Sequence, residues 1–328
     1  MKSAIWLGLA WTLWLPIAAQ GSLGKPERLS ISGTDHVRLE DWGRVNGFQS
    51  RWIIPKQELT LTSPSSTLAF TMDSARMSLN GLHVWLSAPI TLRNGSAWIT
   101  AVDLTTTLQP VLFPTKTSGR RLVKNIVLDP GHGGKDPGFH DGKQQEKKFT
   151  LLLAKEVADL LNKAGLKTSL TRTGDTLPEL SARPELARRR GADLFISLHF
   201  NSAEGAGGVA VKGVEVYCMT PAHTSSTNAR GEGAGAGLYP GNRCDARNIL
   251  LGYQIQKALL KNLPVEDRGL RRARWAVLRP AEMPAVLIEG GFMTNAGEAR
   301  KIYDSLYRRQ MAQAIVEGVR AYKNLVEQ

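Results

Sequence analysis

The sequence predicts an α/β fold with a mostly parallel twisted sheet, helices on both of its faces, and a small β-rich domain in front of it. After residue 125, short apolar runs alternate with longer segments of helical periodicity, a pattern typical of parallel strands joined by helices. Before residue 112, short strand-like runs are separated by turn residues. The chain has 328 residues, which favours two folded units because single domains are usually smaller.

The first 19 residues have the pattern of a signal peptide. Lys2 precedes an apolar run over residues 4–19 that ends in the small pair Ala18-Ala19. A membrane anchor is the alternative, but the run is short for a span and contains Pro16. No second long apolar run follows it. We therefore expect export to the periplasm or cell envelope, without stable membrane insertion of the mature chain.

Residues 22–112 are expected to form the small β-rich domain. Asn80-Gly81 and Asn94-Gly95 each lie between two strand-like runs, and a type I′ hairpin turn needs the positive φ that Asn and Gly tolerate. The run 77–112 loosely resembles the copper amine oxidase N-terminal-like domain, a resemblance that implies no copper here. The polar, basic segment 113–124 is the expected linker.

The second domain is expected to cover residues 125–328. It begins with a strand at 126–128 and a helix that starts at Glu146 and ends at Gly165. Asn295 is expected to cap a last helix, with Glu298 returning the hydrogen bond. A glycine-rich segment, 219–243, interrupts the alternation and is expected to be a surface loop. The remaining elements are expected as strands at 166–173, 193–199, 214–219 and 285–289, and as helices at 181–190 and 245–262.

The basic charge of the chain favours contact with a polyanion. The net charge is +13, and three basic clusters lie at 120–121, 188–190 and 271–274. The alternative is a solvated basic surface that only aids solubility. No helix-turn-helix, zinc-finger or RNA-binding signature accompanies the charge, so we expect no nucleic-acid partner.

The two cysteines, Cys218 and Cys244, are too few for a disulfide scaffold. In an oxidising compartment they could pair, and equally Cys218 could be a buried free thiol. They form no CxxC motif, so a structural zinc site built on cysteine is not expected.

Polar residues follow three of the predicted strands. In open α/β sheets ligands bind beyond the carboxyl ends of the strands. His132 follows the first strand, His199 ends the strand at 193–199, and Glu289 ends the strand at 285–289. Glu146 opens a helix on the same edge. These side chains are therefore expected to converge.

Two imidazoles and a carboxylate, with an open fourth position, form a catalytic zinc set. His132, Glu146 and His199 are the expected ligands of one zinc ion, and Glu289 is the expected general base. Taken singly, each has an ordinary explanation: a lone histidine at a strand end is usually structural, and Glu146 could simply favour the helix dipole. Glu289 is harder to explain in this way, because a charge between apolar and glycine-rich runs would be buried without a partner.

The second domain contains the motifs Val127-Leu128-Asp129-Pro130-Gly131-His132-Gly133-Gly134, Asp136-Pro137-Gly138, Glu146, Thr171-Arg172-Thr173 with Asp175, Leu180, Arg183 and Ala187, Ser197-Leu198-His199 with Asn201, and Val286-Leu287-Ile288-Glu289-Gly290-Gly291-Phe292 with Asn295. Through these motifs it resembles the zinc N-acetylmuramoyl-L-alanine amidases of the bacterial cell wall, over about residues 125–327. The resemblance implies the same ligands, the same catalytic glutamate and a peptidoglycan substrate cut between N-acetylmuramic acid and L-alanine. It says nothing of a protein activator, which remains unknown. Two features differ from the family pattern: Phe200 replaces a small residue, and the loop at 219–243 is long.

Asn201 and Arg183 are the expected substrate-binding residues. The basic surface, with Arg183 and the cluster at 271–274, could hold the acidic polymer, although a merely solvated helix face explains the charge as well. Two other functions remain open. A zinc peptidase that cuts the stem peptide could use the same metal site, and a non-catalytic cell-wall-binding protein could keep the site without activity.

Overall fold

The computed structural model of the protein describes residues 24–116, 122–205, 207–227 and 237–327. The predicted signal peptide, the middle of the predicted linker and the middle of the glycine-rich loop lie outside these residues. Within the described ranges, no helix has the length and apolarity needed to cross a membrane.

The N-terminal part is rich in β-structure, as predicted. Both expected hairpins form, with Asn80 and Gly81 at φ 52° and 84°, and Asn94 and Gly95 at φ 51° and 77°. A short helical segment that the sequence reading did not foresee ends this part. The elements are β1 (Arg28–Ile31), β2 (Thr34–Arg38), α1 (Leu39–Val45), β3 (Gln49–Ile54), β4 (Glu58–Thr62), β5 (Thr67–Thr71), β6 (Arg76–Leu79), β7 (Leu82–Trp85), β8 (Thr91–Arg93), β9 (Ser96–Thr100), α2 (Ala101–Asp103), the π-helical turn η1 (Leu104–Leu108) and α3 (Gln109–Leu112).

The C-terminal part alternates strands and helices, as predicted. The expected last helix is two helices, α7 and α8, separated at Asp304. The strand β14 lies in a stretch for which the sequence predicted no element. The elements are β10 (Asn125–Pro130), α4 (Glu146–Lys163), β11 (Lys167–Leu170), α5 (Ala182–Arg189), β12 (Leu194–Asn201), η2 (Gly208–Ala210), β13 (Val214–Met219), η3 (Pro240–Cys244), α6 (Asp245–Asn262), β14 (Asp267–Ala273), β15 (Ala285–Phe292), α7 (Ala296–Tyr303) and α8 (Ser305–Glu327).

The strands of the C-terminal part follow the order β11-β10-β12-β15-β13-β14. The first four run parallel to one another, whereas β13 pairs antiparallel with β15 and parallel with β14. The sheet is therefore mixed, with a parallel block that brings the carboxyl ends of β10, β12 and β15 to one edge.

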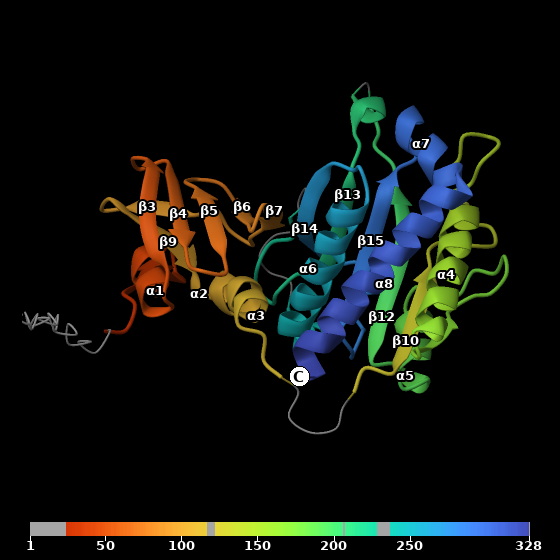
Figure 1. Ribbon diagram of the computed structural model, residues 1–328, viewed down its shortest axis with the longest axis horizontal. Coiled ribbons are helices and arrows are strands. Elements are labelled where there is room, and N and C mark those ends of the chain that lie inside the picture. Colours follow the sequence, from red (N-terminus) through yellow and green to blue (C-terminus); the bar gives the residue numbers. More distant parts are fainter. Residues whose placement is uncertain (1–23, 117–121, 206, 228–236, 328) are drawn as a thin grey trace, which may run out of the picture.

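Alternation along the strands divides the core between the two faces of the sheet. Ile196 and Leu198 of β12 pack with the helices α4, α6 and α8, which lie across one face (Figure 1). Phe195 packs on the other face with Ala187 of α5. By the same alternation His199 projects from this second face, so the larger helices leave it accessible.

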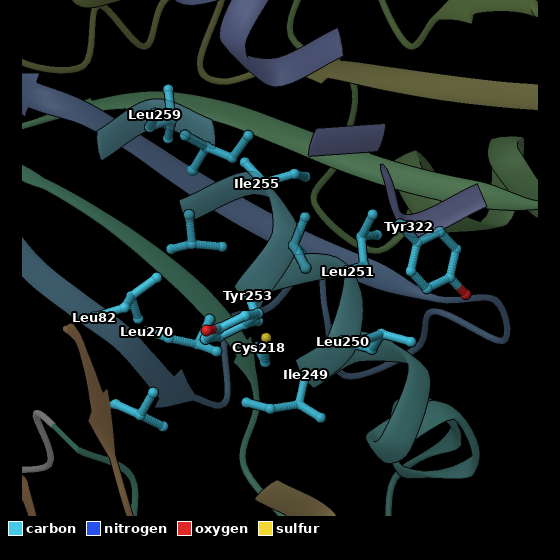
Figure 2. Close-up of a cluster of buried hydrophobic side chains, with 14 of the residues drawn as sticks. Leu82, Cys218, Ile249, Leu250, Leu251, Tyr253, Ile255, Leu259, Leu270 and Tyr322 are labelled. Carbon is cyan, nitrogen blue, oxygen red and sulfur yellow. The ribbon is translucent and has the colours of Figure 1, made fainter. Parts of the chain in front are cut away.

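The N-terminal part joins the C-terminal sheet directly. Strand β7 pairs with β14 through Val84 and Leu270, so β3 to β7 continue the same sheet (Figure 1). The apolar core is also shared: Leu82 of β7 lies with Leu270, Cys218 and the α6 residue Tyr253 in one cluster (Figure 2). The two parts are therefore connected by a packed seam as well as by the chain at 113–124.

Two arginines of the basic cluster at 271–274 are buried, so they fit neither the polymer-binding surface nor the solvated surface that the sequence analysis considered. Arg271 and Arg272 lie in β14 and are 8% and 1% exposed. Arg272 donates to the carbonyl of Thr106 and to the hydroxyl of Thr107, both in the N-terminal part. These two arginines form contacts inside the molecule, and their buried side chains are not available to a polymer.

No disulfide joins Cys218 and Cys244. Cys218 is buried, and its thiol donates to the carbonyl of Asn248, while Cys244 is partly exposed. Burial raises the pKa of the Cys218 thiol to about 12. Of the two readings of the sequence, the buried free thiol describes the structure.

The expected capping box at the start of α7 is half right. The Asn295 side chain accepts from the backbone of Gly297 and Glu298, as predicted. The Glu298 carboxylate does not return to Asn295. It accepts instead from the backbone nitrogens of Gly213, in the loop before β13, and of Phe292, at the end of β15, because both donors lie within its reach and need an acceptor.

Candidate metal centre

Three strands deliver polar side chains to one edge of the sheet. His199 of β12 lies directly opposite Glu289 of β15 in the parallel pair. Residues in register on neighbouring strands project from the same face. Both therefore point away from the face that α4, α6 and α8 cover. This is the position that the strand-end argument predicted.

The turn after β10 places His132 beside them. His132 has φ 60°, a conformation that non-glycine residues rarely adopt. Gly131 lies against the His199 ring, where a Cβ atom would come within 2.3 Å of it. A Cβ on Gly138 would come within 2.5 Å of Glu146 Oε2. The glycines of the motif therefore let the backbone pack against the polar side chains.

His132, Glu146 and His199 come together at this edge. Nε2 of His132 lies 3.0 Å from Oε1 of Glu146, and Nδ1 of His199 lies 3.1 Å from the same oxygen. One ligand atom from each residue lies within 4.8 Å of the others. The trio is a group that can hold a metal ion, and the three predicted ligands are the residues that form it.

Neighbouring groups fix the orientation of the three side chains. Asp136 Oδ2 lies 2.8 Å from Nδ1 of His132, which directs Nε2 into the site. The backbone nitrogens of Phe139 and Phe200 donate to the two oxygens of Glu146 at 3.1 Å. Burial alone would raise the pKa of Glu146, but the hydrogen bonds with the two histidines outweigh it and lower that pKa. Glu146 is thus held as a carboxylate.

Glu289 is buried without a hydrogen-bond partner for one of its oxygens. It is 8% exposed and lines the same open pocket as the metal trio, with Asn201, Trp275 and Leu287. Among the described residues, none donates to its Oε2. Burial raises the pKa of Glu289 well above its ordinary value, and the charges of Glu146 and Glu215 raise it further. A carboxyl group of this kind is suited to carry a proton.

The sequence analysis did not single out Glu215, and it included Asp136 only within a motif, without a role. Glu215 lies directly opposite Glu289 in the antiparallel pair of β13 and β15, and it is 2% exposed. Its signal was present, because a charge inside the apolar run of β13 is the same anomaly that singled out Glu289. Asp136 stands four residues after His132, a spacing consistent with a partner for the imidazole.

The two expected substrate-binding residues have different environments. Asn201 lines the pocket, and its Nδ2 donates to Glu215. Arg183 is 1% exposed and forms an ion pair with Asp129 at 3.1 Å. The prediction that Arg183 holds the polymer is therefore wrong: the arginine offsets the charge of a carboxylate that has no exposure to solvent.

We expect Arg183→Ala to lower the free energy of unfolding by about 3–5 kcal/mol, because it leaves the buried charge of Asp129 without its partner. Urea denaturation of the full chain measures the effect. Arg188→Ala, on the same helix, is the control, since its ion pair with Glu185 is exposed and its removal should change stability little. Equal effects of the two substitutions would show that the buried ion pair contributes no more to the free energy of unfolding than the exposed pair does.

Residues 126–321 match the family model described as N-acetylmuramoyl-L-alanine amidase. AmiA, an N-acetylmuramoyl-L-alanine amidase of Escherichia coli (strain K12), is 33% identical over 230 residues, covering 63% of this chain and 78% of AmiA. LytC, which carries the same description in Bacillus subtilis (strain 168), is 33% identical over 199 residues, covering 61% of this chain. The match spans 35% of the length of LytC.

Solved structures share the fold of the C-terminal part. The catalytic domain of CwlV, an N-acetylmuramoyl-L-alanine amidase from Bacillus (Paenibacillus) polymyxa var. colistinus, superposes with a TM-score of 0.51 at 30% identity. The match covers 62% of this chain and 99% of that chain. The predicted resemblance of residues 77–112 to the copper amine oxidase N-terminal-like domain gains no support from these matches.

Proposed function

This chain belongs to the N-acetylmuramoyl-L-alanine amidase family, and we propose that it hydrolyses the amide bond between N-acetylmuramic acid and L-alanine in peptidoglycan. The observation that carries the proposal is the convergence of His132, Glu146 and His199 in one pocket with Glu289. Family membership supplies the substrate class, and the pocket supplies groups suited to amide hydrolysis.

The donor set fits a zinc ion. Two imidazole nitrogens and one carboxylate oxygen are the ligands of many catalytic zinc sites. Here two of the three residues are oriented by neighbours outside the trio, His132 by Asp136 and Glu146 by the backbone of Phe200. Zinc bound by these residues would lower the pKa of water and polarise the amide carbonyl.

Glu289 is the group that would move the proton. Its Oε2 has no hydrogen-bond donor among the described side chains and backbone, so it can accept a proton from the attacking water. The raised pKa lets the same carboxyl group hold that proton and deliver it to the leaving amine. Asn201 lines the pocket and would orient the substrate with the N–H that does not bind Glu215.

The substrate implies that the protein acts outside the cytoplasm. The pattern of residues 1–19 agrees with this site of action, because it is that of an exported chain. Peptidoglycan carries carboxylates, and the exposed guanidinium groups of Arg188 and Arg189 offer charge of the opposite sign. We propose one zinc ion as cofactor and peptidoglycan as partner.

Digestion of purified sacculi by the full chain, followed by mass spectrometry, tests the function. We expect free stem peptides that begin at L-alanine, together with glycan strands that have lost their stems. Shortened stems still attached to glycan would identify a zinc peptidase instead. Intact sacculi that nevertheless bind the protein would identify a non-catalytic wall-binding protein.

A further inference from the structure

Two buried carboxylates lie side by side in the sheet but have opposite surroundings. Glu215 and Glu289 are directly opposite in the β13/β15 pair. Glu289 has an oxygen without a hydrogen-bond donor in the described part of the chain, whereas Glu215 is surrounded by donors. Like charges this close disfavour each other, so the position of one carboxylate affects the other.

Four side chains hold Glu215. Arg268 and Arg271 of β14 contact its Oε2 through their Nε atoms, at 3.1 and 2.9 Å. Tyr217 and Asn201 donate to its Oε1 at 2.9 and 2.8 Å. Because a buried ion pair is favourable only in good geometry, the place of Glu215 depends on where β14 holds its two arginines.

Trp85 of the N-terminal part contacts both arginines. The guanidinium of Arg271 lies over the indole ring, 4.8 Å from its centroid. The indole Nε1 donates to the backbone carbonyl of Arg268 at 3.1 Å. Trp85 is the last residue of β7, the strand that pairs with β14. One residue of the N-terminal part therefore contacts the guanidinium of Arg271 and the backbone of Arg268, the two arginines that bind Glu215.

We propose that Trp85 is a positioning residue for the catalytic site and acts through Arg268, Arg271 and Glu215 on the placement of Glu289 and Asn201. This inference rests on the proposed function for its effect on the reaction rate. The effect of Trp85 on the position of Glu215 does not depend on the proposed function. The N-terminal part would then contribute to catalysis through Trp85, in addition to being linked to the C-terminal part.

Stacking on Trp85 preorganises the guanidinium of Arg271. A guanidinium stacked on an indole has few alternative directions for its hydrogen bonds. Without the ring, the Arg271 side chain can adopt more conformations. The Glu215 carboxylate, which Arg271 binds, can then move with it and change its position relative to Glu289. Small displacements of reacting groups cost large factors in rate, so the effect should fall on kcat more than on KM.

Trp85→Leu tests the proposal, with Trp98→Leu as the matched control. Trp98 also donates its indole N–H to a backbone carbonyl and lies beneath an arginine, Arg38, but in the separate sheet formed by β1, β2, β8 and β9. On a soluble muramyl peptide, well below the melting temperature of each variant, we expect kcat to fall roughly tenfold for Trp85→Leu and less than twofold for Trp98→Leu. Zinc content should be unchanged in both.

A conservative variant and a crystal structure complete the test. Trp85→Phe keeps a ring face over Arg271 and should retain kcat within about threefold; it also serves if Trp85→Leu does not fold. In the structure of the Leu variant we expect the Glu215 carboxylate to shift by about 1 Å or more. An unmoved Glu215, or equal losses of kcat at Trp85 and Trp98, would overturn the proposal. An inactive wild-type chain would count against the proposed function alone, since the crystallographic comparison still decides the positioning role.

Discussion

Glu289→Gln is expected to retain zinc and to lose about 10²–10⁴-fold in kcat, the contribution typical of general acid–base catalysis. The amide has nearly the shape of the carboxyl group, so it should fit the same buried position. It cannot accept a proton from water, and hence both proton transfers are lost. Steady-state hydrolysis of a soluble muramyl peptide, with zinc measured on the same samples, gives the result.

Glu298→Gln is the control for this substitution. Glu298 is also buried near the end of β15, but its carboxylate accepts from the backbone of Gly213 and Phe292 and does not line the metal pocket. Its amide variant should lose stability and keep kcat within a few-fold. If Glu289→Gln hydrolysed the substrate at the normal rate, Glu289 would have no part in the chemistry.

His132→Ala and His199→Ala are each expected to lose most of the bound zinc and, with it, the activity. Each would supply one of the three proposed protein ligands, and affinity for zinc depends on the full set. Elemental analysis of dialysed protein should show about one zinc ion per wild-type chain and less than about a tenth of that in either variant.

His140→Ala is the matched control for the two ligand variants. His140 is exposed and lies near the start of α4, close to the site in sequence, but it is not part of the metal group. Its removal should leave the zinc content at the wild-type value. Full zinc retention in His132→Ala would refute the assignment of that ligand.

The parts of the molecule that the sequence predicted are those with local signals. Strands β10, β12, β13 and β15 are short apolar runs, and α4 and α6 have helical periodicity over 18 residues each. The site followed from the same reading, because polar residues after parallel strands meet at one edge. Glu289 was identifiable since a charge in an apolar strand requires an explanation.

The missed features depend on contacts between distant parts of the chain. β14 has the sequence DRGLRRA, which has too many charges for a buried strand that lacks partners. Its arginines contact Glu215 and Trp85, which are far away in the sequence. Arg183 looked like a surface cation for the same reason, because its partner Asp129 lies 54 positions earlier. Glu298 had the spacing of a capping box, but two closer donors compete for it. Local patterns carry no information on such partners.

The seam between the two parts was equally invisible in the sequence. Pairing of β7 with β14 rests on one register contact, Val84 with Leu270, and on an apolar cluster assembled from both parts (Figure 2). Each of these residues would also suit an ordinary strand or helix within a separate domain. The sequence therefore suggested two units joined by a linker, and the packed connection became visible only in three dimensions.

His132, Glu146 and His199 are proposed to bind one zinc ion that faces Glu289. X-ray diffraction from crystals of the full chain, recorded on both sides of the zinc absorption edge, tests it most directly. We predict a single anomalous peak about 2.0–2.2 Å from Nε2 of His132, Nδ1 of His199 and a carboxylate oxygen of Glu146. A zinc peak at another position, or none here in crystals soaked with zinc, would contradict the account.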